Sequence, residues 1–195
     1  MAVRTVWRIG RAGSLDRLAR QEDPLVIPGT GEARVSVRAV GLNFADIFAC
    51  MGLYSATPEG PFVPGLEFAG TIDAVGPDIQ RWHAGDRVIG LTRFGAYATH
   101  VTVDPRYLYP LPAGWTFSEG AAFPVQAITA WYAIDRLGGC ARGDAVLVHS
   151  AAGGVGLNAL ALLRARGAPL LEHRLAQDIR PAQHHQGQGD HAHGQ

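Results

Sequence analysis

Short apolar runs alternate with turn-forming residues over the first 112 residues of the chain. Glycine, proline and aspartate interrupt these runs at close intervals, as at 28–29 (PG) and 76–78 (GPD). Runs of this length between such residues are typical of strands in a small antiparallel barrel or sandwich. We expect strands at 5–9, 33–40, 67–75, 86–91, 96–103 and 107–111.

The pattern becomes helical after this region. Ser118 can cap a helix that continues through the apolar segment 130–134 and ends at the glycine pair 138–139. Pro124 is expected to bend the start of this helix, because proline lacks the N–H that the helical ladder uses.

An apolar run, a glycine-rich turn and another helix follow. Segment 144–149 (DAVLVH) is typical of a buried strand, and a helix is expected at 157–166. Gly153 and Gly154 have no β-carbon, so backbone there can approach phosphate oxygens, and Gly156 lets the helix pack close to the strand. The helix start adds free N–H groups and a positive dipole end. The turn indicates a dinucleotide pyrophosphate site, although glycine-rich helix starts also occur in protein cores.

The composition changes after residue 168. Segment 169–195 holds five of the eight histidines and has little apolar periodicity, so we expect it not to fold on its own. A dinucleotide-binding parallel sheet needs several more βα units than the remaining length allows. We therefore interpret the end of the chain as a gene fragment or a frame-shifted segment. Its cluster of His184, His185, His191 and His193 is either a disordered tract or an adventitious metal site.

Charge and cysteine usage narrow the function class. Seventeen basic and seventeen acidic residues cancel without a basic run, which disfavours a nucleic-acid or membrane-surface partner. No apolar run approaches the roughly 18 residues of a membrane helix. Cys50 and Cys140 stand alone, so the sequence predicts neither a disulfide scaffold nor secretion, and a cytoplasmic location is expected.

Five short motifs occur in a definite order. They are GLNFAD at 41–46, GLY at 52–54, PGLEFAG at 64–70, GDRV at 85–88 and HSAAGGVG at 149–156. This succession resembles the medium-chain dehydrogenase/reductase superfamily, and the quinone oxidoreductase (zeta-crystallin-like) branch is nearest.

The resemblance implies an α/β chain with a mainly β GroES-like barrel domain followed by the first strand–turn–helix of a Rossmann domain. The corresponding boundaries are 1–117 for the substrate domain, 118–168 for the linker helix and incomplete NADP-binding domain, and 169–195 for the tail. An incomplete sheet exposes an edge and an apolar face, so we expect self-association or low solubility, and a homodimer is one form that this could take.

The resemblance also bears on metal chemistry. Zinc-dependent relatives carry cysteine at the place of Asn43 and histidine at the place of Leu66, together with a four-cysteine lobe, and none of these ligands is present. A catalytic zinc site needs about three nitrogen, sulfur or carboxylate ligands. The implied reaction is therefore hydride transfer from NADPH to a quinone or an α,β-unsaturated carbonyl without a metal ion. An enoyl-thioester reductase and a catalytically inactive chain that binds or dimerises remain as alternatives.

Two residues are candidates for substrate chemistry. The amide of Asn43 can bond the nicotinamide or the substrate carbonyl, or it can simply close a strand. Tyr54 can donate to a developing enolate or quinol oxygen, or it can be a half-buried barrel tyrosine. At Phe48 some quinone reductases have tyrosine, so no acid is expected there.

The remaining candidates concern the cofactor and the packing around it. By resemblance, Thr129 lies near a cofactor phosphate, and Gln126 is a weaker candidate. We expect Asp46 and Glu67 to satisfy local backbone donors, and His149 to be packed and hydrogen-bonded on its strand. The expected cofactor contacts are Asn43, Thr129, Ala152, Gly153, Gly154, Val155 and Gly156.

Overall fold

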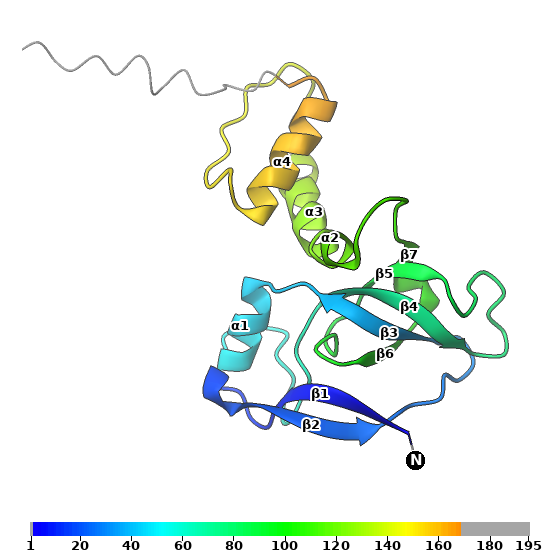
Figure 1. Cartoon of the computed structure of the whole chain (residues 1–195). Helices are drawn as coiled ribbons and strands as arrows, with labels where there is room; N and C mark the ends of the chain where they lie inside the picture. Colours follow the sequence, from blue (N-terminus) through cyan, green and yellow to red (C-terminus); the bar gives the residue numbers. More distant parts are fainter. Residues whose placement is uncertain (1, 169–195) are drawn as a thin grey trace, which may run out of the picture.

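The computed structural model describes residues 2–168 of the chain. A β-rich part carries the N-terminus, and a smaller helical part lies beyond it, joined through the helices α2 (Phe117–Ala121) and α3 (Pro124–Trp131) (Figure 1). This order follows the change from strand-like to helix-like patterning in the sequence.

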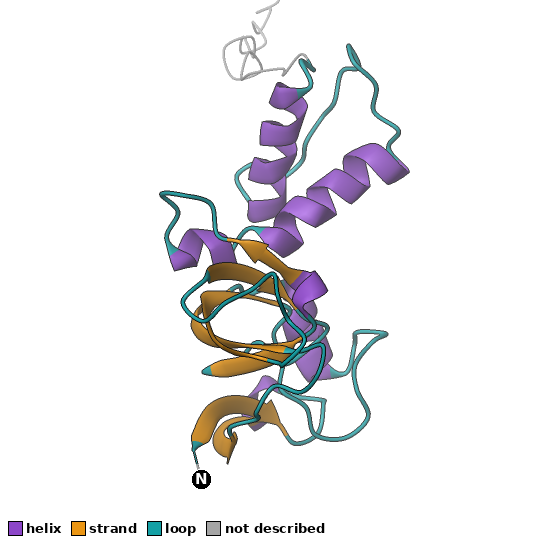
Figure 2. Cartoon of the chain, turned by 90° about the vertical axis from the view of Figure 1, so that its right-hand side faces the viewer, coloured by secondary structure: helices purple, strands orange, loops and turns teal. Residues whose placement is uncertain are grey.

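All strand pairs in the β-rich part are antiparallel. One hairpin consists of β1 (Val3–Ile9) and β2 (Leu18–Pro24). The main sheet has the order β6-β3-β4-β5-β7 and curls into an open barrel (Figure 2). Its strands are β3 (Ala33–Val40), β4 (Glu67–Val75), β5 (Arg87–Leu91), β6 (His100–Val103) and β7 (Leu108–Pro110).

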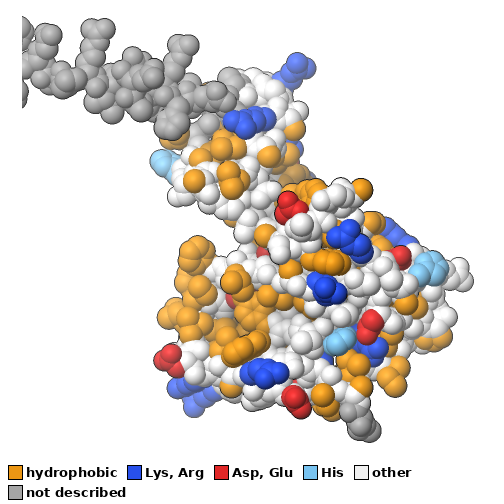
Figure 3. Space-filling model, viewed as in Figure 1, with side chains coloured by type: hydrophobic (Ala, Val, Ile, Leu, Met, Phe, Trp, Pro, Cys, Tyr) orange, Lys and Arg blue, Asp and Glu red, His pale blue; other side chains and the backbone are white. Residues whose placement is uncertain are grey.

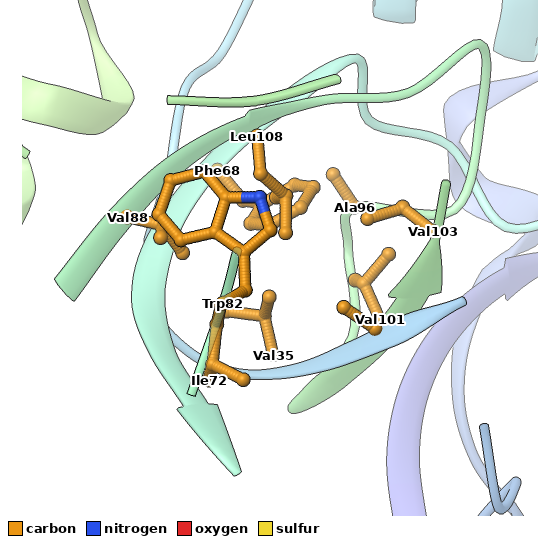
Figure 4. Close-up of a cluster of buried hydrophobic side chains, with 10 residues drawn as sticks. Val35, Phe68, Ile72, Trp82, Val88, Ala96, Val101, Val103 and Leu108 are labelled. Carbon is orange, nitrogen blue, oxygen red and sulfur yellow. The ribbon is translucent and has the colours of Figure 1, made fainter. Parts of the chain in front are cut away.

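The interior of the barrel is filled by side chains from every strand of the main sheet (Figure 4). Phe68 is fully buried, and Trp82, which lies in the turn between β4 and β5, covers one end of the cluster. Alternation along β3 places Ala33 and Val35 inside the barrel, as the period of two in a strand requires. The predicted bounds of β3 and β4 are confirmed residue for residue.

Two elements of this part were not predicted. β2 is largely polar and exposed, so its sequence lacks the apolar pattern on which strand prediction depends; pairing with β1 makes it a strand. Helix α1 (Phe44–Met51) begins after Asn43 and ends at Gly52, which has a left-handed conformation with φ of 75°. Two short 3₁₀ helices, η1 (Leu15–Arg17) and η2 (Pro105–Tyr107), complete the connections.

The predicted long helix is interrupted once, at 122–123, and its second part changes from α- to π-helical geometry at Tyr132. Thr116, not Ser118, caps α2 (Phe117–Ala121): its hydroxyl accepts from the Glu119 N–H, and the Glu119 carboxylate accepts from the Thr116 N–H at 2.7 Å. The prediction of Ser118 as the cap was wrong because both residues suit that position, and the reciprocal pair with Glu119 selects Thr116. Pro124 starts a new helix.

The helical part is held together by packing between its elements. Its elements are α3 (Pro124–Trp131), the π-helix η3 (Tyr132–Leu137) and α4 (Gly154–Ala165). Ala130 and Leu163 belong to one buried cluster that joins them. Asp135 and Arg166 form a two-bond ion pair, which lowers the pKa of Asp135. Within residues 2–168, no helix has the length and apolarity that crossing a bilayer requires.

Segment 144–149 is not a strand in this structure, in contrast to the prediction. It runs as an irregular connection between η3 and α4, and Leu147 is 70% exposed. Val146 and Val148 still pack against the helical cluster on one side. A strand is defined by hydrogen bonds to neighbouring strands, and the described residues place no strand beside this segment.

Candidate functional site

A cleft of about 800 Å³ separates the connection 144–150 from the helices behind it. Its walls come from that connection, from the start of α4 at 153–156, and from α3 and η3 through Ala130 and Ile134. Phe44, the first residue of α1, also lines the cleft. Because Phe44 directly follows Asn43, the cleft lies where the β-rich part meets the helical part.

The start of α4 provides three backbone donors at this cleft. Gly153 is the N-cap, and its carbonyl accepts from the N–H of Leu157 at 2.8 Å. The N–H groups of Gly154, Val155 and Gly156 have no hydrogen-bond partner within the described part of the chain. Such groups, with the positive end of the helix dipole, favour an anion. The start of α4 therefore presents three unpaired N–H groups and a positive dipole end at the cleft.

The three glycines of this turn have different surroundings. A β-carbon on Gly153 would meet only the Ser150 carbonyl oxygen, at 3.3 Å. At Gly154 it would lie 1.8 Å from Oε1 of Gln126 on α3, and at Gly156 it would lie 2.4 Å from the Ser150 oxygen. The missing β-carbon therefore leaves room for the Gln126 side chain at Gly154 and for the Ser150 carbonyl of the same loop at Gly156. Gly153 faces more open space.

Ala152 and Val155 flank these glycines. Val155 is 41% exposed and lines the cleft. Ala152 is exposed and does not line the cleft. Thr129, one helix away, is exposed, and its hydroxyl donates to the Val125 carbonyl at 2.6 Å. Of the predicted cofactor contacts, the structure therefore gathers the glycine turn and Val155 at one cleft.

Asn43 is held at the start of α1 by two acidic residues. Its backbone N–H donates to Oδ2 of Asp46 at 2.9 Å, and its side-chain Nδ2 donates to Oε1 of Glu67 at 2.8 Å. The second oxygen of Glu67 accepts from the N–H of Val125, near the start of α3, also at 2.8 Å. The expectation of a local backbone donor is confirmed for Asp46, whereas Glu67 accepts from a side chain and from a backbone N–H that lie 24 and 58 residues away in sequence.

Both carboxyl groups lie out of solvent. Glu67 is 0% exposed and Asp46 is 2% exposed, and burial raises the pKa of each. The hydroxyl of Tyr97 donates to Oδ2 of Asp46 at 3.1 Å, and burial together with that carboxylate raises the pKa of Tyr97. Tyr97 was not among the predicted site residues, because it lies 51 residues from Asp46 along the chain and no local motif marks the contact.

Two further predictions concern Tyr54 and His149. Tyr54 lies in the turn after α1 and is 37% exposed, and its hydroxyl makes no hydrogen bond to any of residues 2–168. It does not line the cleft. His149 is exposed at the mouth of the cleft, so the expectation of a packed, hydrogen-bonded histidine was wrong. That expectation depended on a buried strand that segment 144–149 does not form.

Sequence reasoning gave Phe44 no role and Gln126 only a weak one. Phe44 is 78% exposed and stacks on Phe48 with ring centroids 6.5 Å apart. Apolar side chains gather over α1 on this face of the molecule (Figure 3).

We found no group of three histidine, cysteine, aspartate or glutamate residues placed to hold a metal ion among residues 2–168.

Comparison with known proteins gives matches to both parts of the chain. Residues 29–113 match the family model of the alcohol dehydrogenase GroES-like domain. The synaptic vesicle membrane protein VAT-1 homolog of Rattus norvegicus is 44% identical over 154 residues, which make up 78% of this chain and 38% of that protein. The mainly β GroES-like architecture predicted from the sequence is thus confirmed.

Two solved structures show the same fold over most of the chain. The CurK enoyl reductase aligns with a TM-score of 0.79 at 32% identity, covering 86% of this chain and 53% of that one. The quinone oxidoreductase of Escherichia coli complexed with NADPH aligns with a TM-score of 0.77 at 32% identity, covering 87% and 51%. The chain spans about half the length of these solved relatives.

Proposed function

Because this chain belongs to the medium-chain dehydrogenase/reductase superfamily, we propose that it acts as an NADPH-dependent oxidoreductase on a small quinone or an α,β-unsaturated carbonyl. The proposed reaction uses no metal ion. The relatives named above include an enzyme of each kind, a quinone oxidoreductase and an enoyl reductase.

One observation carries this proposal. The residue after Asn43, Phe44, lines the same cleft as the glycine turn at the start of α4. Asn43, the substrate-side candidate, directly precedes Phe44, and the turn, about 110 residues later in sequence, is the cofactor-side candidate; the cleft that Phe44 and the turn share supports placing the two reactants near each other. A hydride transfer needs this proximity, because donor and acceptor carbons must approach closely.

The residues that would hold NADPH are those of the α4 start. The free N–H groups of Gly154, Val155 and Gly156 would bind phosphate oxygens, and the absence of a β-carbon at Gly153 leaves room for them. The bound cofactor supplies the hydride. The complex of the E. coli relative with NADPH supports this choice of nucleotide.

The chain's own part in the reaction is to position the two reactants and to exclude water. With NADPH bound, the nicotinamide would supply a hydride to a carbon of the acceptor, and solvent at the edge of the cleft would supply the proton that the acceptor's oxygen or neighbouring carbon takes up. Asn43 can donate a hydrogen bond to a carbonyl oxygen that gains negative charge. The apolar side chain of Phe44 makes the cleft suitable for a flat, uncharged acceptor.

An enoyl thioester is the second candidate substrate, because the CurK enoyl reductase shares the fold over 86% of this chain. Quinones and enoyl thioesters both accept hydride at an activated carbon. They differ in shape, since a quinone is a flat ring and a thioester substrate is a long chain. A direct comparison of the two classes therefore identifies the substrate.

The test follows loss of NADPH absorbance with a panel of small quinones, simple enones and short enoyl thioesters. Gly153→Val fills the open space at the turn and is expected to abolish NADPH binding, measured by fluorescence. Gly10→Val is the matched control, because a β-carbon on Gly10 meets no atom within 4 Å. The proposal fails if the parent chain neither binds millimolar NADPH nor reduces any acceptor, or if both variants bind equally well.

A further inference from the structure

The side chain of Glu67 is the most buried charged group at the proposed site. We propose that Glu67 is a positioning residue: it holds the Asn43 amide and the first turn of α3 in one fixed arrangement. The inference rests on the proposed function, because it gives Asn43 the task of contacting a reactant. The local sequence gives Glu67 only the task of accepting from nearby backbone donors, and neither of its two observed partners is near it in sequence.

The geometry comes from three elements. Glu67 lies at the start of β4, Asn43 precedes α1, and Val125 is the second residue of α3. Each carboxylate oxygen takes one donor at 2.8 Å, Oε1 from Asn43 Nδ2 and Oε2 from the Val125 N–H. One side chain therefore connects the barrel, the start of α1 and the start of α3.

The carboxylate also determines which end of the Asn43 amide faces it. An ionised carboxylate only accepts hydrogen bonds, so the NH2 end of Asn43 must face Glu67. One N–H of this group is used, and the other has no partner within residues 2–168. Asn43 is thereby kept as a hydrogen-bond donor, which suits the carbonyl oxygen of an acceptor or of the nicotinamide amide.

Packing leaves the carboxylate little freedom. A β-carbon on Gly41 would lie 2.2 Å from Oε1 of Glu67 and 2.4 Å from the Ala121 carbonyl oxygen. The backbone at Gly41 thus presses against the carboxylate from one side. Because Glu67 is 0% exposed and the Gly41 backbone lies against its carboxylate, the side chain is held in one conformation, as a positioning residue requires.

The contact with Val125 extends the arrangement to the cofactor side. Gln126 is the next residue of α3, and its amide lies against Gly154 at the start of α4. A shift of the first turn of α3 would therefore move a side chain that borders the proposed phosphate site. Glu67 affects both reactants through backbone and side-chain contacts, without touching either.

The arrangement needs Glu67 to be ionised, because a protonated oxygen would present a hydrogen to Asn43 or to Val125. Burial raises the pKa of Glu67, and so does the charge of Asp46. Tyr97 also interacts electrostatically with Glu67 and bonds Asp46, and Cys50 of α1 interacts with Asp46 and Tyr97. As pH falls through the raised pKa of Glu67, the arrangement is expected to be lost.

The first test does not depend on turnover. In Glu67→Gln, one oxygen becomes an NH2 group, so either Asn43 or Val125 loses its acceptor. The side-chain N–H signals of Asn43, followed by two-dimensional ¹H–¹⁵N NMR, are expected to move with pH in the parent chain and to lose that dependence in the variant. Identical Asn43 signals in both proteins would overturn the inference, whatever the result for NADPH.

The second test uses catalysis. Glu67→Gln is expected to lower kcat/KM by about ten- to a hundredfold, the usual effect of losing a hydrogen bond to a charged group. The acidic limb of the pH profile should disappear as well. Retention of full kcat/KM with an unchanged limb would overturn the inference, whereas inactivity of the parent chain would contradict only the proposed function.

A double variant separates positioning from stability. In Asn43→Asp with Glu67→Gln, the carboxylate of the first can accept from the NH2 of the second, and the Gln oxygen can accept from Val125. The melting temperature lost in Glu67→Gln should return, but activity should not, because position 43 no longer donates. Recovery of activity together with stability would mean that Glu67 has only a structural role.

Discussion

The side-chain amide of Gln126 occupies the place where a β-carbon of Gly154 would lie, with Oε1 only 1.8 Å from that position. Gly154 begins α4 and Gln126 belongs to α3, so the glycine allows the two helices to approach. Gly156, two residues later, is instead pressed against the Ser150 carbonyl oxygen of its own loop. Glycine at position 154 is therefore required by the contact between two helices, and glycine at position 156 by the path of its own loop.

Replacement of each glycine by alanine tests this difference. For Gly154→Ala the obstructing group is the end of a flexible side chain, which can swing away, so stability should change by less than about 1 kcal/mol. For Gly156→Ala the obstructing atoms belong to backbone, and overpacking there should cost about 1–3 kcal/mol. Thermal or denaturant unfolding measures both.

The double variant Gln126→Ala with Gly154→Ala is the control. Without the glutamine amide, the new methyl group has space, so the double variant should be as stable as Gln126→Ala or more stable. Equal destabilisation by Gly154→Ala and Gly156→Ala would contradict the assignment of these contacts.

Asp46 makes stability depend on pH. Its pKa is raised by burial, so the folded state holds the proton more tightly than the unfolded state does. The stability that this group contributes is fully present below its unfolded pKa and is lost as pH rises through the folded pKa. Asp46→Asn keeps one oxygen for the donors Asn43 and Tyr97, both of which bond a single oxygen of Asp46.

We therefore expect the melting temperature of Asp46→Asn, measured relative to that of the parent chain, to increase as pH rises from the acidic range to neutrality. Calorimetry across this range measures the difference. Asp23, an acid whose pKa is lowered by Arg8, is the matched control. Asp23→Asn should show the opposite trend: its melting temperature relative to that of the parent chain should decrease as pH rises. Parallel curves for Asp46→Asn and the parent chain would refute this account.

The apolar surface over α1 should make the chain associate at high concentration. Leu42, Phe44 and Leu53 are 72%, 78% and 68% exposed, and the patch is visible in Figure 3. Contiguous exposed apolar surface of this kind favours self-association. Sedimentation velocity should show a concentration-dependent increase in mass that Phe44→Gln with Leu53→Gln reduces.

Ile27→Gln provides the comparison for that experiment. Ile27 is 85% exposed but lies in the connection between β2 and β3, apart from α1. Its replacement should leave association unchanged. A monodisperse monomer at every concentration would rule out this role for the α1 surface.

Segment 144–149 should exchange its amide hydrogens quickly. The N–H groups of residues 145–149 have no partner within the described part of the chain, whereas those of β3 and β4 lie in a paired sheet. Hydrogen exchange requires opening of the hydrogen bond, so the paired strands should be protected and this segment should not. Mass spectrometry of peptides covering both regions measures it, and protection of 145–149 would show that the segment pairs as a strand.

The sequence by itself determined the elements whose signals are local. β3 and β4 could be delimited because each is an apolar run between turn-forming residues. The glycine turn and the helix after it could be identified because a helix start depends on residues close in sequence. The family could be recognised for the same reason, since its motifs are short and contiguous.

Only the tertiary structure decided which distant residues meet. Glu67 contacts partners 24 and 58 residues away, and β2 is a strand because β1 lies beside it. Segment 144–149 has a strand-like sequence but is not a strand, since a strand needs hydrogen bonds from neighbours that its own residues cannot provide. Contacts of this kind depend on where the whole chain places its backbone, and no local pattern of side chains encodes them.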